Sequence, residues 1–135
     1  MPSALRRSML SLALLPLLCA ASPNAHAGEP AKMKQFLYVL QLVPRLHAES
    51  AWTDADNKAV DDHFARLQQA TQAGTVILAG RTAEPLDKTF GLVVFEAKDE
   101  AEARRFMDSD PAVVAGVMTA TLHPYSVALL RKSGG

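Results

Sequence analysis

The order of apolar and amphipathic segments is the feature that most restricts the fold of this chain. Residues 54–73 and 100–108 carry apolar side chains at helical spacing, and each segment follows a residue that commonly caps a helix N-terminus, Thr53 or Asp99. A short helical turn is expected at 112–115, after Pro111 has ended the second helix. Four apolar segments rich in β-branched and aromatic residues are predicted to be strands: 35–43, 75–80, 89–96 and 117–130.

These six elements follow one another as strand, helix, strand, strand, helix, strand. This order is typical of the ferredoxin-like β-α-β-β-α-β fold of the α+β class, in which a four-stranded antiparallel sheet carries both helices on one face. With 135 residues, of which 49% are hydrophobic, the chain is long enough for one such domain with a modest core. We therefore predict a single ferredoxin-like domain.

The predicted strands are apolar on both faces. In the first strand Phe36 and Tyr38 alternate with Leu37 and Val39, and the third strand repeats the pattern. A sheet with one solvated face alternates apolar and polar residues, and two helices cover only one face. We therefore predict that a second copy of the chain covers the other face, which would give a homodimer of the dimeric α+β barrel type. The alternative is that the C-terminal tail or the loop 45–52 folds across the sheet.

The first 27 residues are typical of a cleavable export signal. Arg6 and Arg7 precede an apolar stretch, 9–21, that is shorter than the roughly 20 residues of a membrane span, and an Ala-His-Ala triplet then offers a cleavage site. We predict a signal peptide at 1–27 and one domain at 28–135. The domain is expected to be periplasmic or secreted and free of the membrane after cleavage. The arginine pair leaves both the general and the twin-arginine export routes open.

The composition of the predicted domain excludes several functions. The signal segment holds two of the 14 basic side chains and none of the 14 acidic ones, so the rest of the chain is slightly acidic. A nucleic-acid-binding protein needs a basic face, so we expect no nucleic-acid partner. The single cysteine, Cys19, would leave with the signal, which excludes disulfides and thiol catalysis. The sequence also lacks the P-loop, GxGxxG, HExxH and GxSxG patterns of nucleotide-binding proteins, zinc proteases and serine hydrolases.

Two residues are considered separately as candidates for chemistry. His63 lies at the margin of the apolar face of helix 54–73, a face that carries Val60, Phe64, Leu67 and Thr71. A partly buried imidazole beside a carboxylate is the usual form of a general base, although a histidine at the edge of the core is the alternative. Asp110 precedes Pro111, a step that commonly begins a turn and a new helical segment. Spacing alone does not favour a catalytic role for either residue.

The remaining histidines give weaker signals. His123 shares a strand face with Thr121 and Tyr125, so His123 and Tyr125 could line a cavity as substrate-binding residues or fill a dimer core. His47 and Glu49 could offer two metal ligands on a loop, which is too few for a metal site. We therefore expect no metal and no cofactor.

Several segments together resemble one known family. They are FLYVLQ, HFARLQ beginning at His63, ILAGR, FGLVVFEA, and EARRFMDSDPAVVAGV followed by HPYSVALL. In this order, from Phe36 to Leu130, they are similar to the YCII-related (YciI-like) family of small dimeric ferredoxin-like proteins. The resemblance implies an active site in a cleft beside the sheet, built on a His–Asp pair that corresponds to His63 and Asp110. Some members also carry an aspartate at the end of the first strand. Here 42–44 reads Leu-Val-Pro, which puts any reaction that needs two carboxylates in doubt.

The resemblance, taken with the residues, predicts a cofactor-free enzyme that transfers a proton on a small organic substrate, as an isomerase or a lyase does. His63 would be the acid or base, and Asp110 would orient it. One alternative is a non-catalytic dimeric protein of the same fold that binds a small molecule or acts as an accessory. Another is a heme- or metal-linked dimeric α+β barrel. An imidazole within hydrogen-bond reach of a carboxylate, beside an open pocket, would favour the enzyme.

Overall fold

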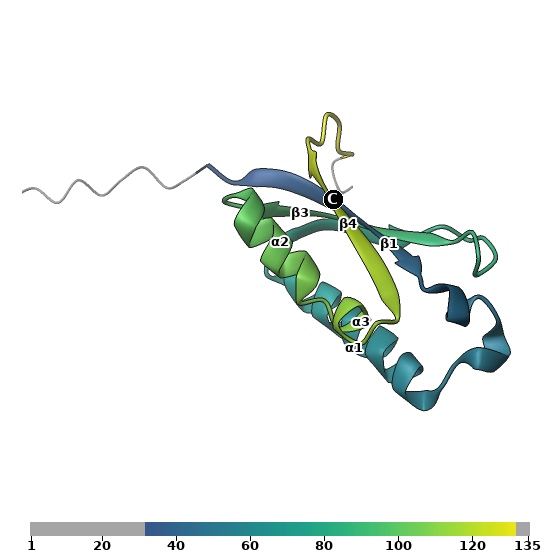
Figure 1. Ribbon diagram of the computed structural model, residues 1–135. Coiled ribbons are helices and arrows are strands. Elements are labelled where there is room, and N and C mark those ends of the chain that lie inside the picture. The colour runs from purple at the N-terminus through teal and green to yellow at the C-terminus, as the bar shows by residue number, and fades with distance from the viewer. Residues whose placement is uncertain (1–31, 132–135) are drawn as a thin grey trace, which may run out of the picture.

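The computed structural model describes residues 32–131 as an antiparallel sheet with helices on one of its faces (Figure 1). The predicted signal peptide lies outside the described residues. The strands are β1 (Lys34–Leu42), β2 (Val76–Arg81), β3 (Phe90–Ala97) and β4 (Met118–Tyr125). The α-helices are α1 (Asp54–Gln72), α2 (Glu100–Asp108) and the short α3 (Pro111–Val114), and two 3-10 turns, η1 (Pro44–Leu46) and η2 (Glu49–Ala51), lie between β1 and α1.

The sheet has the strand order β2-β3-β1-β4, and every neighbouring pair is antiparallel. This arrangement, with the helices on one face, confirms the predicted α+β ferredoxin-like fold. Caps define the helix starts as expected. The Thr53 side chain accepts a hydrogen bond from the N–H of Asp56 in a reciprocal capping box, and Asp99 caps α2 in a similar way.

The prediction for the last strand was wrong in length. β4 ends at Tyr125, not at residue 130, and residues 126–131 have no regular structure. Among the described strands β4 lies at the edge and pairs with β1 alone, and the last paired residues are Gln35 and Tyr125. The Gln35 side chain then accepts a hydrogen bond from the N–H of Val127 at 2.8 Å, which replaces the next backbone bond of the ladder.

The core between the sheet and the helices is built on aromatic rings. Phe95 is fully buried, stacks on Phe106 of α2 at 4.7 Å between ring centroids, and meets the edge of Tyr38 at 5.6 Å. Phe36 completes the cluster at 6.0 Å from Phe95. Such offset and edge-to-face pairs are favourable beyond the area that they bury. The cluster therefore fixes α2 and β1 relative to β3, and with them the residues that surround Tyr38.

Helix α1 is rotated relative to the prediction. Of its predicted core face only Leu67 is buried, and Phe64 is 68% exposed. The face that packs against α3 carries Ala59 and His63 instead, so His63 lies in the middle of the packed face and not at its margin. The rotation leaves the apolar stripe of α1 over a cavity, which is described below.

The loop between β1 and α1 is tied to the helical side of the molecule. The Arg45 guanidinium donates two hydrogen bonds to the Asp56 carboxylate, and the Trp52 indole N–H donates one to the Leu46 carbonyl at 3.0 Å. Leu46 is fully buried against Ala59 and neighbouring residues of α3 and β4. This loop therefore does not fold across the other sheet face, which removes one alternative to a dimer.

The sheet face away from the helices is apolar at its centre. By strand register, Leu37 and Val39 of β1 share this face with Leu92 of β3, and Leu78 of β2 is 54% exposed beside them.

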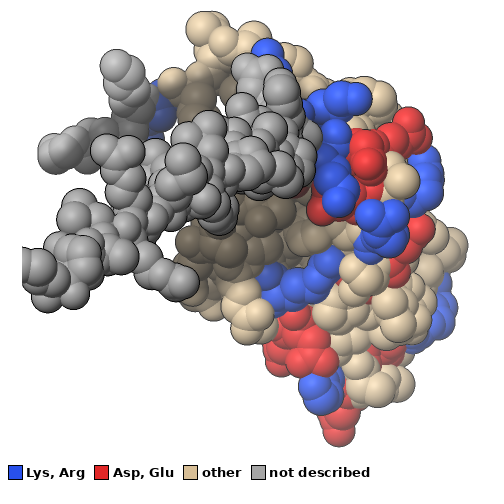
Figure 2. Space-filling view, turned by 90° about the vertical axis from the view of Figure 1, so that its left-hand side faces the viewer, with Lys and Arg blue, Asp and Glu red and all other residues tan. Residues whose placement is uncertain are grey.

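On the view in Figure 2 the basic and acidic side chains are intermixed, with no large area of one sign. Among residues 32–131, no helix is long and apolar enough to cross a membrane.

Candidate functional site

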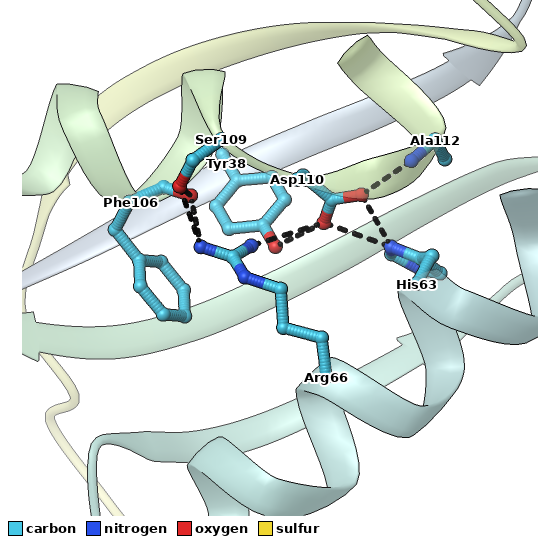
Figure 3. Close-up of polar contacts among 7 residues, drawn as sticks. All are labelled: Tyr38, His63, Arg66, Phe106, Ser109, Asp110 and Ala112. Atoms are coloured by element: carbon cyan, nitrogen blue, oxygen red, sulfur yellow. Dashed lines mark hydrogen bonds and ion pairs between the residues drawn. The ribbon is translucent and has the colours of Figure 1, made fainter. Parts of the chain in front are cut away.

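His63 and Asp110 lie in direct contact, although 47 residues separate them in the sequence. The Nδ1 atom of His63 is 2.8 Å from both carboxylate oxygens of Asp110. His63 comes from the third turn of α1, and Asp110 caps the N-terminus of α3, where its Oδ1 accepts a hydrogen bond from the N–H of Ala112 at 3.0 Å (Figure 3). The turn that the Asp-Pro step predicts therefore exists, and it aims the carboxylate at α1.

Two further side chains hold the same carboxylate. The Tyr38 hydroxyl donates to Oδ2 of Asp110 at 3.0 Å, and Nη1 of Arg66 lies 3.6 Å from the same oxygen (Figure 3). Arg66 is fixed in turn by α2. Its Nη2 donates to the Phe106 carbonyl at 2.7 Å and to Oγ of Ser109 at 2.9 Å, and its guanidinium lies 4.2 Å from the centre of the Phe106 ring. Asp110 thus has a cation, an imidazole, a phenol and a backbone N–H around it.

Asp110 and Tyr38 are both completely buried. Burial alone would raise the pKa of Asp110. The hydrogen bond and charge of His63, with the donors from Ala112 and Tyr38, outweigh it and lower the pKa below the usual value. Burial and the neighbouring Asp110 charge raise the pKa of Tyr38, so its hydroxyl stays protonated and donates. Asp110 is therefore a carboxylate at neutral pH.

The state of Asp110 decides which nitrogen of His63 carries hydrogen. An ionised carboxylate can only accept, so Nδ1 of His63 must donate. In the neutral imidazole the lone pair is then on Nε2. No residue of the described segment 32–131 forms a hydrogen bond with Nε2, and the His63 side chain is 12% exposed. Nε2 is therefore not taken up by another described side chain.

A cavity of about 990 Å³ lies beside His63. It is a half-open cleft between α1, β2 and β3, and its walls are mostly apolar. The stripe Val60, Phe64, Leu67 and Thr71 of α1 forms one wall together with His63. Residues of β1 and β3 such as Leu40 and Val93 form the floor, and Trp52 lies at the loop side. Cavities of this size hold small organic ligands, so His63 sits where a bound molecule would meet it.

The sequence match to known proteins covers this whole site. The YCII-related domain matches residues 37–122. The chain belongs to the YCII-related domain family. Among solved structures, a similar one is 5-chloro-2-hydroxyhydroquinone dehydrochlorinase (TftG) from Burkholderia phenoliruptrix AC1100, in complex with 2,5-dihydroxybenzoquinone. It has 18% sequence identity and a TM-score of 0.47 over 68% of this chain and 93% of that chain. No curated protein matches the sequence.

The structure does not bring all the predicted site residues of this YCII-related protein together. His123 pairs with Leu37 and Tyr125 with Gln35, so both belong to the sheet face away from the helices. His63 and Asp110 lie on the helical face. His123 and Tyr125 therefore do not lie beside His63 within one chain, and a substrate-binding role for them stays a prediction.

The other weak candidate behaves as a loop residue. His47 lies with its Nε2 3.3 Å from the Leu42 carbonyl and is exposed. In the described part of the chain, no three His, Cys, Asp or Glu side chains are grouped closely enough to hold a metal ion. His47 and Glu49 therefore have no third ligand there.

Sequence reasoning missed Tyr38 and Arg66 as parts of the site. A signal existed for each. Tyr38 is a hydroxyl-bearing residue between Phe36 and Leu40 on an inward strand face, and a buried tyrosine hydroxyl needs a partner. Arg66 follows His63 by three residues, which places it on the same helix face. Both signals point to an anionic group across the core, and Asp110 is that group: it accepts a hydrogen bond from Tyr38 and forms an ion pair with Arg66.

Proposed function

We propose that this protein is a cofactor-free enzyme that moves a proton on a small organic molecule, with His63 as the acid–base residue and Asp110 as its positioning residue. One observation carries the proposal. Nδ1 of His63 is held by a buried carboxylate, and His63 also lines a mostly apolar cavity of about 990 Å³. This arrangement leaves the second ring nitrogen of His63, Nε2, for a molecule bound beside the mostly apolar walls.

In the proposed step, Nε2 of His63 takes a proton from a carbon or oxygen acid, and the electron pair stays on the substrate as an enolate or phenolate. The imidazolium is stabilised by the Asp110 carboxylate at 2.8 Å. Return of the proton to another atom gives an isomerisation, and expulsion of a leaving group gives an elimination. One histidine serves both half-reactions, which fits a chain with no acid at the end of β1.

Proton transfer can be tested before the natural substrate is known. Small ketones, lactones and hydroxyaromatic compounds are incubated with the protein in D2O, and loss of the acidic C–H signal is followed by proton NMR. We expect exchange of at least one compound to be accelerated by about 10²-fold or more, the usual contribution of a general base. His63→Gln should abolish the acceleration because it removes the accepting nitrogen.

A second variant separates catalysis from folding. Gly91 lines the cavity, and a Cβ placed there would meet Leu40 only at an ordinary contact distance of 3.5 Å. Gly91→Ala should therefore fold, narrow the cavity at this point and slow exchange without replacing His63 or Asp110. If compounds bind in the cavity but none exchanges faster than in buffer, the proposal fails, and the protein is a small-molecule-binding member of the fold.

We also propose a homodimer through the sheet face that no helix covers. Support comes from the apolar row formed by Leu37, Val39 and Leu92 at its centre. Val39→Glu places a charge in that row and should convert a sedimenting dimer to a monomer in analytical ultracentrifugation. Val114→Glu, at a 70% exposed position on α3, is the matched control and should leave the dimer intact. A wild-type protein that sediments as a monomer would contradict the proposal.

A further inference from the structure

The charged residues of the cavity are few and differ in kind. Arg81 is the only lysine or arginine among its described lining residues, and Asp61 is the only carboxylate. Arg81 ends β2 on the row that faces the helices, opposite Gly91 of β3, whereas Asp61 belongs to the exposed side of α1. The sheet wall therefore carries the one permanent positive charge of the cavity, and the α1 rim carries a negative one.

The Arg81 side chain has no polar partner in the described part of the chain. Arg45 is bound to Asp56, Arg66 to the Phe106 carbonyl, and Arg104 to Glu100, but no hydrogen bond or ion pair joins the side chain of Arg81 to any of residues 32–131. Gly91, its cross-strand neighbour, has no side chain to shield it. A guanidinium in this setting offers several donors in one plane, the geometry that suits a carboxylate or another oxyanion.

The proposed reaction needs such a cation. Proton transfer to Nε2 of His63 leaves a full negative charge on the substrate, and the apolar walls give little stabilisation to it. Among the described lining residues, Arg81 alone can supply a lasting positive charge, and Asp61 disfavours an anion at the α1 rim. The favourable orientation therefore places the anionic oxygen toward the sheet and the acidic hydrogen toward α1.

We infer that the cavity binds an apolar organic acid, with Arg81 pairing to its anionic oxygen and His63 facing its acidic hydrogen. The substrate class is thus a compact hydrophobic molecule that carries, or acquires during the reaction, one delocalised negative charge on oxygen. This inference rests on the proposed function for the role of His63. The anion preference itself depends only on Arg81 and the cavity.

The single tryptophan gives a direct measurement. Trp52 lines the cavity and is the only tryptophan in the chain, so its fluorescence reports occupancy. Cyclohexanecarboxylate, cyclohexylmethanol and cyclohexylmethylamine share the same ring but are negatively charged, neutral and positively charged. None of them absorbs at the excitation wavelength. We expect the wild-type protein to bind the carboxylate about tenfold more tightly than the alcohol, a difference of about 1.4 kcal/mol. The amine should bind most weakly.

Variants make the assignment specific. Arg81→Gln should bind the carboxylate and the alcohol equally, because the charge is lost while the size is nearly kept. Arg104→Gln, at an exposed position on α2 away from the cavity, should keep the tenfold preference. Arg81 is exposed at a strand end, so its replacement should leave the circular dichroism spectrum unchanged.

Three results would contradict the proposed anion site. No saturable binding of the carboxylate, a tighter amine than carboxylate, or an undiminished preference in Arg81→Gln would each overturn the inference. His63→Gln should still bind the carboxylate. An Arg81-dependent preference without any proton exchange would therefore reject the proposed catalysis while leaving the anion site in place, so the two failures can be told apart.

Discussion

The Asp110→Asn variant is expected to lose about 3 kcal/mol of unfolding free energy at pH 7. Asp110 is completely buried, and it balances the charge of Arg66 while it accepts hydrogen bonds from His63, Tyr38 and Ala112. Removing one member of a buried charged pair leaves the other uncompensated, which typically costs about 3–5 kcal/mol. The amide keeps the size and part of the hydrogen bonding, so we expect the lower end. Urea unfolding followed by circular dichroism measures the loss.

The same substitution should change the tautomer of His63. The amide group of asparagine can donate to Nδ1, which would move the ring hydrogen to Nε2 and remove the lone pair that the proposed step uses. Nitrogen-15 NMR of labelled histidine distinguishes the two tautomers directly. Asp108→Asn, an exposed carboxylate at the end of α2, is the matched control and should change neither stability nor tautomer. An unchanged His63 spectrum in Asp110→Asn would refute the pairing.

The pH dependence follows from the lowered pKa of Asp110. A carboxyl that ionises more easily in the folded chain adds stability that is fully present above its unfolded pKa of about 3.9. This stability is lost as the pH falls through the folded value. The difference between wild type and Asp110→Asn should therefore be largest at neutral pH and shrink below about pH 4. If the stability difference between wild type and Asp110→Asn stays constant in acid, it arises from the packing of the side chain and not from its charge.

The fold was predictable because local signals agree with one another. The caps Thr53 and Asp99, the alternating apolar strands and their order each indicate the same topology. The orientation of α1 was not predictable in this way. Its apolar stripe with Phe64 suggests a buried face, but packing of α3 turns Ala59 and His63 inward and leaves Phe64 over the cavity. That choice depends on contacts between elements distant in sequence.

The site was predictable only in part for a related reason. Strand alternation correctly places His123 and Tyr125 together, but both faces of the sheet are apolar. Alternation therefore cannot say which face the helices cover, and the two residues proved to lie away from His63. The pairing of His63 with Asp110 was expected only from the family resemblance, because a hydrogen bond across 47 residues needs the packing of α1 against α3.

Replacing Phe95 with alanine should destabilise the protein by about 4 kcal/mol, the typical cost of truncating a fully buried phenylalanine. Phe95 stacks on Phe106, which in turn lies under the Arg66 guanidinium, and it also contacts the edge of Tyr38. Its loss therefore loosens two of the groups that hold Asp110. Thermal and urea unfolding give the stability, and the nitrogen-15 spectrum of His63 reports whether the hydrogen bond to Asp110 weakens with it.

Phe64→Ala is the matched control, since it removes the same side chain from a position that is 68% exposed. Its effect on the unfolding free energy should stay within about 0.5 kcal/mol, as is usual for surface positions. It should instead weaken binding of apolar molecules, because Phe64 lines the cavity. Equal destabilisation by the two substitutions would mean that Phe64 is covered in solution and that the cavity is closed. Destabilisation by Phe95→Ala alone would show that Phe95 supports the His63–Asp110 pair, whereas Phe64 contributes to ligand binding.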